Sequence, residues 1–521
     1  MNHILCGLAA NPALPAELVD RLIAVAITDA GADAGAGADA GAGAGAGAEI
    51  AAELAARPDL GHAQARALAA HAEDIAVHLA YEGRLTSADI DPVAQPQAAL
   101  ALLDTGAGPP EWARRFATDP VTERRERLAA CPDLPPDVTD TLAADSEIAV
   151  VAELALWTTP DMAARLARHP HAEVRRAVAA NEATPPAVLE MLLTGDGLPP
   201  ARRCLVCDRE RTPAAHARPR PADDLPPGAF CTGSHESTLH EMGRQALSNP
   251  ATPARAAAGF ADHSSGLLRW ALAARPDLPP EAGRRLAEDP LPGVRADLAE
   301  NPALDAAHLR ALATDVSPDV RRSVAHNPQV PLDVLTSLAG TAKIGATLLP
   351  RIAAATPAEV EELAKSRDPV VRMLLAARRD LPPGIRDALA ADTDAKVLKS
   401  IAPHPGLSEA RLRAMIDRHG VRVLARVATN PDASPSLLEH VTRHDPPVQK
   451  AFREVARHPG ATAPSLLACL TDRQARPAAA AHPSLPAEVI VELLGDDEGR
   501  VAEAAAANPS LPRAVMAKLT P

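Results

Sequence analysis

Apolar residues recur along this chain in pairs of short helical patterns. In one clear case, Val294 and Leu298 lie four residues apart and therefore share one face of a helix. The following Asn301-Pro302 ends that helix, because the residue before a proline is pushed out of the α region. A second apolar face with helical spacing follows at Leu304, Leu309 and Leu312. The pattern predicts a unit of two short helices, of which the first spans a turn or two and is open to a 3₁₀ form.

This unit recurs at a nearly constant distance. The turn between its helices reads NPATP, RPDLPP, NPALD and NPQVP at 26-residue steps, with first residues Asn249, Arg275, Asn301 and Asn327. Further turns, most of them 23 to 28 residues apart, bring the total to about 18 units. The weak matches are those at Glu82, Thr105, Trp157 and Ala353. Such a period predicts an all-α solenoid, whose units stack and bury a continuous core between neighbours.

Asparagine is the commonest first residue of the turn. It is most simply explained as the side chain that satisfies backbone groups in a tight Asn-Pro turn. Histidine replaces it at His404, His458 and His482, and we interpret these histidines as turn residues too. Two residues before the turn stands an alanine in most units, which predicts close packing of helix backbones.

Six residues before the turn stands a recurrent arginine. The members of this arginine row are Arg125, Arg175, Arg269, Arg295, Arg321, Arg372 and Arg476. The row either holds phosphates or carboxylates of a partner or pairs with the acidic residue that opens its own helix. The expected pairs are Asp289 with Arg295, Asp315 with Arg321 and Asp368 with Arg372. The acidic total charge favours this structural role, in which each exposed pair contributes well under ~1 kcal/mol.

These positions together resemble the leucine-rich repeat variant family. The shared pattern is D-P-x-x-x-V-R-x-x-[LV]-A-x-N-P-x-[LV]-P-x-x-x-L-x-x-L-A-x-D, and it is strongest over residues 249–340 and 458–519. The resemblance implies a right-handed superhelix of alternating α and 3₁₀ helices without strands. It also implies that an iron–sulfur cluster is compatible with such repeats, since a member of that family carries one beside them.

Two long gaps between turns divide the array. A Gly/Ala/Asp tract at 29–48 has no side chains to bury and much backbone entropy to lose, so it is expected to be a disordered loop. The gap between Asn181 and Asn249 holds a cluster of cysteines. The expected organisation is a first repeat, the loop, further repeats, a metal-binding module and the remaining repeats, at 1–28, 29–48, 49–198, 199–247 and 248–521.

The cysteine cluster has the spacing of a metal site. Its candidate ligands are Cys204, Cys207, Cys231 and His235, with His240 on an expected helix over 236–247 as the alternative fourth ligand. A C-x2-C turn lets two thiolates reach one ion, and a later Cys and His complete a tetrahedron, which favours structural zinc. The CTGSH segment at 231–235 also resembles a [2Fe–2S] motif, so an iron–sulfur cluster is the alternative. Four protein ligands leave no open position for catalytic water.

Composition narrows the classes of function. The formal net charge of −14 argues against duplex nucleic-acid binding, and three Trp, one Tyr and four Phe provide few platforms for stacking single strands. Cys6, Cys131 and Cys469 are expected to be isolated packing residues. No secretory signal or membrane span is expected, so the protein is expected to be cytoplasmic.

The sequence therefore predicts a non-catalytic solenoid that binds a protein or peptide on a concave surface and carries a structural zinc site. The alternatives are a redox- or metal-responsive protein with an iron–sulfur cluster and a nucleic-acid binder that uses the arginine row. The sequence leaves open whether the two ends of the array associate, and it does not predict an oligomeric state.

Overall fold

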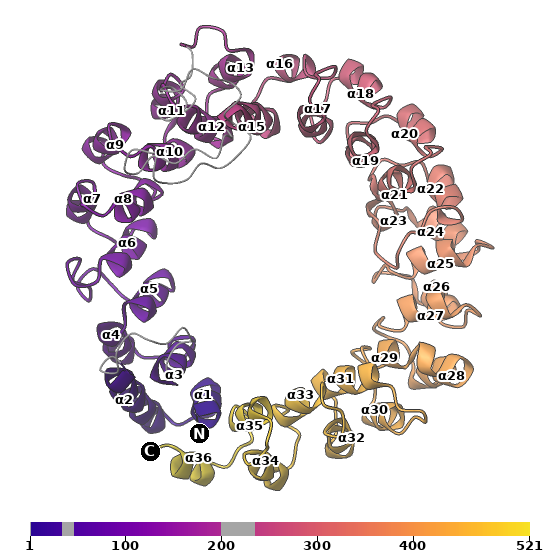
Figure 1. The fold of residues 1–521 in the computed structure, drawn as a ribbon. Helices are drawn as coiled ribbons and strands as arrows, with labels where there is room; N and C mark the ends of the chain where they lie inside the picture. Colours follow the sequence, from indigo (N-terminus) through magenta and orange to yellow (C-terminus); the bar gives the residue numbers. More distant parts are fainter. Residues whose placement is uncertain (1, 34–45, 200–234) are drawn as a thin grey trace, which may run out of the picture. The chain divides into compact units, whose positions relative to one another are not determined.

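The computed structural model describes residues 2–33, 46–199 and 235–521. Within these ranges the chain forms α-helices and one short 3₁₀ helix, and it contains no strand. The helices pair and stack as repeats, so the predicted all-α solenoid is confirmed (Figure 1). The chain divides into two compact units, one of residues 1–85 and 344–521 and the other of residues 86–343. We call them unit 1 and unit 2.

The helices of unit 2 alternate between those that end at a repeat turn, the first helices, and those that follow it, the second helices. They are α6 (Pro96–Asp104), α7 (Pro110–Phe116), α8 (Thr122–Ala129), α9 (Pro136–Ala143), α10 (Ile148–Trp157), α11 (Pro160–Leu166), α12 (Ala172–Ala180), α13 (Pro186–Thr194), α15 (His235–Ser248), α16 (Ala254–Ala258), α17 (Gly266–Ala273), α18 (Pro280–Leu286), α19 (Pro292–Glu300), α20 (Ala306–Leu312), α21 (Pro318–His326) and α22 (Leu332–Ala339).

Unit 1 is built in the same way from both ends of the chain. Its helices are α1 (Asn2–Ala10), α2 (Ala16–Asp33), α3 (Ala46–Ala55), α4 (His62–His71), α5 (Glu73–Tyr81), α23 (Pro350–Ala353), α24 (Pro357–Ala364), α25 (Pro369–Leu375), α26 (Pro383–Leu389), α27 (Ala395–Ile401), α28 (Glu409–His419), η3 (Gly420–Arg422), α29 (Leu424–Val427), α30 (Pro435–Thr442), α31 (Gln449–Arg457), α32 (Ala463–Cys469), α33 (Arg476–Ala480), α34 (Ala487–Leu493), α35 (Gly499–Ala506) and α36 (Arg513–Leu519).

Helices α19 and α20 show how one repeat forms. Proline opens α19, where its missing N–H costs no hydrogen bond, and Asn301 ends the helix with an extended backbone (φ −66°, ψ 123°). Asp305 then caps α20 by accepting from the backbone N–H groups of Ala307 and His308. Both helices are α-helices, so the alternation with 3₁₀ helices is wrong for the described repeats; η3 is the exception among them.

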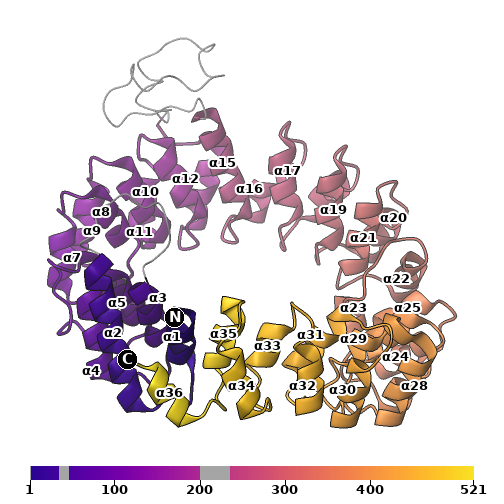
Figure 2. The same cartoon turned by 60° about the horizontal axis from the view of Figure 1, so that its bottom comes forward.

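First helices pack on first helices, and this contact carries the core. Helix α19 lies between α17 and α21, while α18, α20 and α22 form a second row. Figure 2 shows the same two rows in unit 1, with α29, α31, α33 and α35 beside α30, α32 and α34. The alanines two residues before the turns, Ala273, Ala299 and Ala325, are each 0% exposed. The predicted close packing at alanine is confirmed.

The weakly matching turn positions also lie at the ends of helices. Helices α5, α6 and α10 stop at or immediately before Glu82, Thr105 and Trp157, and α23 stops at Ala353. The unit that follows Glu82 has no second helix, because residues 82–95 form turns. A missing helix therefore explains why this unit departs from the pattern.

Helices enter both ranges in which the sequence predicts an interruption. Helix α2 continues to Asp33 and α3 begins at Ala46, so both enter the expected loop 29–48, whose remaining residues lie outside the described ranges. Helix α15 overlaps the C-terminal end of the expected metal module 199–247 but packs against α12 and α17 as an ordinary first helix. The predicted helix over 236–247 is thus confirmed, and it belongs to the array.

In unit 1, the first repeat packs on the last. Helix α1 lies against α35, and a Cβ on Gly7 would collide with the backbone oxygen of Glu503. His3 also contacts Glu503, with 3.3 Å between Nδ1 and Oε2. The ends of the array therefore associate within the chain. Among the described residues, no helix combines the length and apolar character needed to cross a membrane.

Candidate protein-binding surface

The turn asparagines link each repeat to the one before it. The Oδ1 atom of Asn301 accepts from the N–H of Ala303 at 2.8 Å, inside its own turn. Its Nδ2 atom donates to the carbonyls of Ala273 and Arg275, in the preceding repeat, at 2.7 and 2.6 Å. Asn301 is 3% exposed, so these bonds satisfy a buried amide. The predicted turn role is confirmed, and the link between repeats is added to it.

The same asparagine link joins the last turn to the first. Asn11 donates through Nδ2 to the carbonyls of Ala506 and Asn508, both at 2.8 Å. Its Oδ1 atom accepts from the N–H of Ala13 at 2.8 Å. The junction between the ends of the array is therefore built like a junction inside it.

Histidine can take the place of asparagine in this arrangement. The Nε2 atom of His458 lies 2.8 Å from the carbonyl of Asn430, and its Nδ1 accepts from the N–H of Gly460 at 3.0 Å. His482 repeats the arrangement against His458 and Ser484. These two are turn residues, as predicted. Burial lowers the pKa of His482 below its ordinary value, which favours the neutral ring that this geometry needs.

The arginine row forms a second series of bonds between repeats, with different partners from those expected. We call this series the arginine ladder, and the series of asparagine links the asparagine ladder. Arg295 donates to the carboxylate of Asp315, 20 residues later, at 2.7 and 3.0 Å. Only its contact at 2.6 Å to the backbone oxygen of Asp289 lies within its own repeat. The carboxylate of Asp289 instead receives Arg269 of the preceding repeat. The same i to i+20 pairing recurs at Arg125–Asp145, Arg372–Asp392 and Arg476–Asp496.

The expectation of exposed pairs within one helix is therefore wrong. Among the described residues, Arg321 bonds only to backbone oxygens, those of Asp315 and Val316, and Arg175 likewise bonds to those of His169 and Pro199. Neither has an aspartate 20 residues later, since Thr341 and Gly195 stand there. Carboxylate pairs form wherever that aspartate is present.

These pairs are largely buried, which strengthens the attraction between the two charges. The side chains of Arg269 and Asp289 are 11% and 2% exposed. The hydrogen bonds from Arg295 lower the pKa of Asp315 below its ordinary value, because they favour the charged carboxylate more than burial opposes it. The guanidinium groups of the paired row are thus engaged within the array, which supports their structural role.

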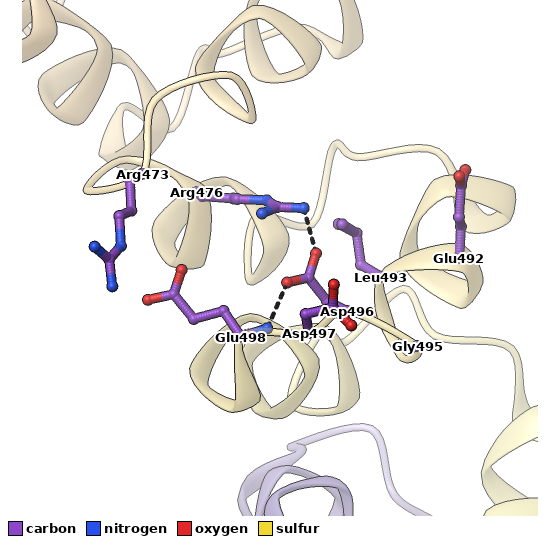
Figure 3. Close-up of a pocket in the computed structure, with 8 residues that line it drawn as sticks. All are labelled: Arg473, Arg476, Glu492, Leu493, Gly495, Asp496, Asp497 and Glu498. Carbon is purple, nitrogen blue, oxygen red and sulfur yellow. Dashed lines mark hydrogen bonds and ion pairs between the residues drawn. The ribbon is translucent and has the colours of Figure 1, made fainter.

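Figure 3 shows the last of these pairs at the edge of a pocket of about 630 Å³. Arg476 contacts Asp496, whose second oxygen accepts from the N–H of Glu498 at 2.9 Å. Arg473, Glu492 and Asp497 complete much of the lining. Because the Arg476–Asp496 pair belongs to the arginine ladder, we assign this pocket to the packing of repeats.

A groove of different character lies on the first helices α8, α10 and α12 of unit 2. Its volume is about 440 Å³. Its apolar floor is formed by Ile148, Ala149, Ala152, Leu156, Ala177 and Ala180. Its charged rim is formed by Glu126, Glu153, Glu173 and Arg176. Helix α10 supplies much of the floor because Ala149 and Ala152 stand at positions where α8 and α12 carry charged residues.

The rim is acidic, and one of its carboxylates stands alone. Arg176 pairs with Glu173 at 3.3 Å, and Glu153 accepts from the indole N–H of Trp157 at 2.8 Å. Glu126 has no hydrogen-bond or ion-pair partner among the residues with described positions. Trp157 is 61% exposed beside the groove. The groove, which we call the acidic groove, thus offers an apolar floor, an exposed aromatic side chain and negative charge.

Only two of the predicted metal ligands, His235 and His240, belong to the described residues. Cys204, Cys207 and Cys231 lie outside the described residues, and His235 begins α15. His240 lies on α15 with its Nε2 atom 2.5 Å from Oγ of Ser265. In the described ranges, no three His, Cys, Asp or Glu side chains gather as a metal would require.

The three isolated cysteines are packing residues, as predicted. Cys6, Cys131 and Cys469 are buried free thiols. Burial raises the pKa of Cys6 to about 11 and the pKa of Cys131 and Cys469 to about 12. Thiols with such pKa values remain protonated at neutral pH and are poor nucleophiles.

Comparison with known proteins adds a few distant likenesses. No family model and no curated protein matches the chain. Nine solved chains match. The structure of a leucine-rich repeat variant with a novel repetitive motif is 17% identical over 52% of this chain and 87% of that one, with a TM-score of 0.28. With so low a score, the assignment of the repeat fold rests on the helices described above.

Two further solved structures cover more of the chain. The Pds5–Scc1 complex is 13% identical over 89% of this chain and 64% of that one, with a TM-score of 0.16. The SYS-1/POP-1 complex is 10% identical over 94% and 91%, with a TM-score of 0.15. Neither likeness bears on the function of this chain.

Proposed function

We propose that the protein is a non-catalytic scaffold that binds a partner protein through its first helices. The observation that carries this proposal is the acidic groove on α8, α10 and α12. Buried ladders hold the repeats together without Glu126 and Glu153, neither of which bonds to a neighbouring repeat among the described residues. A surface that combines an apolar floor with unpaired charge is typical of a protein interface.

The groove favours a partner segment with an apolar side chain flanked by Lys or Arg. The apolar side chain would cover the alanines of the floor, where burial contributes roughly 25 cal/mol per Å². A cation beside it would meet Glu126 and Glu153 on the rim. Trp157 supplies an exposed aromatic group of the kind that often dominates binding energy.

The test is binding of a peptide of this chemistry to the full chain. A fluorescent peptide with Leu and Arg in alternation is titrated with wild-type protein and with the variant Glu126→Lys/Glu153→Lys. The matched control is Glu361→Lys/Glu362→Lys, which makes the same charge change at two exposed positions of α24. We expect about a tenfold weaker complex in the groove variant only. Equal affinity in both variants would reject the groove.

The proposed scaffold also carries a structural zinc site, formed by Cys204, Cys207, Cys231 and a histidine. The cysteine spacing supports this part of the proposal. Because the ring of His240 lies against Ser265, His235 is our preferred fourth ligand. Elemental analysis should find one zinc per chain, lost in Cys204→Ser and retained in Cys131→Ser. Iron with labile sulfide would instead favour the iron–sulfur alternative.

A further inference from the structure

A second charged region lies in unit 1, on three consecutive first helices. Helices α27, η3 with α29, and α31 carry seven cationic residues and a single acidic one, Glu454. The cations are Lys396, Lys399, Arg422, Arg426, Lys450, Arg453 and Arg457. We call this set the cationic stripe. It is a local excess of positive charge in a chain whose formal net charge is −14.

The stripe follows the repeat. Lys396, Arg422 and Lys450 each stand eight residues before a turn, at His404, Asn430 and His458. Equivalent positions of stacked repeats lie side by side, and α29 contacts both α27 and α31. Since packed helices lie about 8–10 Å apart, the three cations span roughly 20 Å along the row. The remaining four cations flank them on the same helices.

The charges of the stripe are not used inside the molecule. None of the seven cations forms an ion pair with any residue that the structure describes. The arginine ladder is different, because Arg372 and Arg476 of the same unit each meet an aspartate. Six of the seven cations are exposed, and Arg453 is half-buried. The Nε atom of Arg453 is buried and has no hydrogen-bond partner among the described residues.

An array of unpaired like charges costs repulsion, and a buried donor without a partner adds to that cost. The repulsion is relieved when an anion covers the stripe. The spacing over three repeats suits an extended chain that carries several negative charges, since one small anion would reach only part of it.

We propose that the cationic stripe binds an Asp- and Glu-rich segment of a partner protein. This inference rests on the proposed scaffold function and names the chemistry of a second contact. Val421, 48% exposed beside Arg422, adds an apolar contact of the kind that a peptide provides. Phe452, the aromatic residue of these helices, is only 7% exposed, so no stacking platform for nucleobases accompanies the charges.

Charge reversal across the stripe tests this inference. A fluorescent peptide of twelve alternating Asp and Glu residues is titrated into the full chain, and anisotropy is followed at low and high salt. The variant is Lys396→Glu/Arg422→Glu/Lys450→Glu. The matched control is Lys365→Glu/Arg513→Glu/Lys518→Glu, which changes the same charge at exposed residues of unit 1 outside the stripe. Circular dichroism verifies that both variants keep their helix content.

We expect the stripe variant to bind at least about tenfold more weakly and the control within about twofold of wild type. Affinity should also fall as salt rises, because exposed charges are screened. Equal weakening in both variants would overturn the inference. So would tighter binding of a single-stranded oligonucleotide with the same number of charges, which would assign the stripe to nucleic acid.

The result is separable from the test of the scaffold. If the acidic peptide fails while the Leu/Arg peptide binds the acidic groove, the stripe inference falls and the scaffold proposal stands. If the acidic peptide binds the stripe while the groove variant changes nothing, the acidic groove falls and the stripe stands.

Discussion

The acidic groove and the cationic stripe use the same part of the repeat with opposite charge. Both lie on first helices, at positions eight, five and four residues before the turn. In the groove, Glu173 and Glu126 stand eight and five residues before their turns, and in the stripe Lys450 and Arg453 occupy the same two positions. The buried positions of the two regions are alike, with alanine two residues before each turn. The comparison separates the residues that build the array from those free to recognise a partner.

This separation has a physical basis. Residues that contact the neighbouring repeat are held by packing and by buried hydrogen bonds, so few side chains fit there. Residues on the other side of the same helix face solvent and tolerate either charge at little cost to stability. A solenoid can therefore place an acidic surface and a basic surface on one scaffold.

The largest effect should come from breaking the scaffold beneath the stripe. Asn430 donates to the carbonyls of Ala402 and His404 at 2.6 Å each and accepts from the N–H of Asp432 at 2.9 Å. Asn430→Ala leaves these buried groups without partners, and we expect a loss of about 3 kcal/mol or more. Urea unfolding measures the loss, and hydrogen exchange should locate it in α27 and α29.

The control for that variant is Thr429→Ala, one residue earlier, whose hydroxyl donates to the carbonyl of Arg426, three residues before it in the same repeat. Its effect should stay near 0.5 kcal/mol, roughly that of an ordinary surface substitution. If the two substitutions cost the same, the asparagine ladder does not hold the repeats together.

A smaller effect is expected at the arginine ladder beneath the groove. Arg125 and Asp145 are 13% and 7% exposed and join through hydrogen bonds of 2.6 and 3.2 Å. Asp145→Asn removes the negative partner of a largely buried guanidinium, which should cost about 2 kcal/mol. The control is Asp140→Asn, whose pair with Arg165 is more than half exposed and should contribute under about 1 kcal/mol.

The same pair predicts a dependence on pH. Burial alone would raise the pKa of Asp145, but hydrogen bonds from Arg125 and from the N–H of Glu147 outweigh it and lower the pKa below its ordinary value. The stabilisation is therefore complete above the unfolded pKa, near about 4, and is lost as the pH falls through the lower folded value. The difference in free energy of unfolding between wild type and Asp145→Asn should be smaller at pH 3 than at pH 7. A constant difference would contradict this origin.

The smallest effect on stability should come from the recognition surfaces themselves. Lys399→Glu and Glu126→Lys each change a residue that pairs with no other described side chain. We expect each to change the free energy of unfolding by less than about 0.5 kcal/mol. Lys399→Glu should weaken binding of the acidic peptide, and Glu126→Lys should weaken binding of the Leu/Arg peptide. A large loss of stability in either variant would show that the residue helps to build the array. It would contradict the separation of recognition residues from scaffold residues.

Much of the scaffold was predictable from the sequence, because it repeats. The alanine position, the Asn-Pro turn and the helix boundaries follow from period and propensity. The partner of Arg295 was predicted wrongly, because Asp289 is closer in sequence than Asp315. The constant step of 20 residues between each ladder arginine and its aspartate was a usable signal for the correct partner.

The surfaces were harder to predict for a different reason. Glu126, Glu153 and Glu173 come from three helices, and they form one rim only after the repeats stack. The charges of Lys396, Arg422 and Lys450 become one stripe in the same way. Neither set has a motif of its own, since unpaired charge is a property of the assembled array. The metal module remains a prediction from the spacing of Cys204, Cys207 and Cys231.

The packing of α1 on α35 affects where unfolding of the array begins. Linear repeat arrays melt from their ends, where the terminal helix has a neighbour on one side only. Here α1 and α35 are each other's neighbour, and Gly7 permits a contact as close as those inside the array. Unfolding at the ends must therefore begin by separating α1 from α35, a contact like those between interior repeats. Early proteolytic cleavage in α1 would then report any loss of that contact.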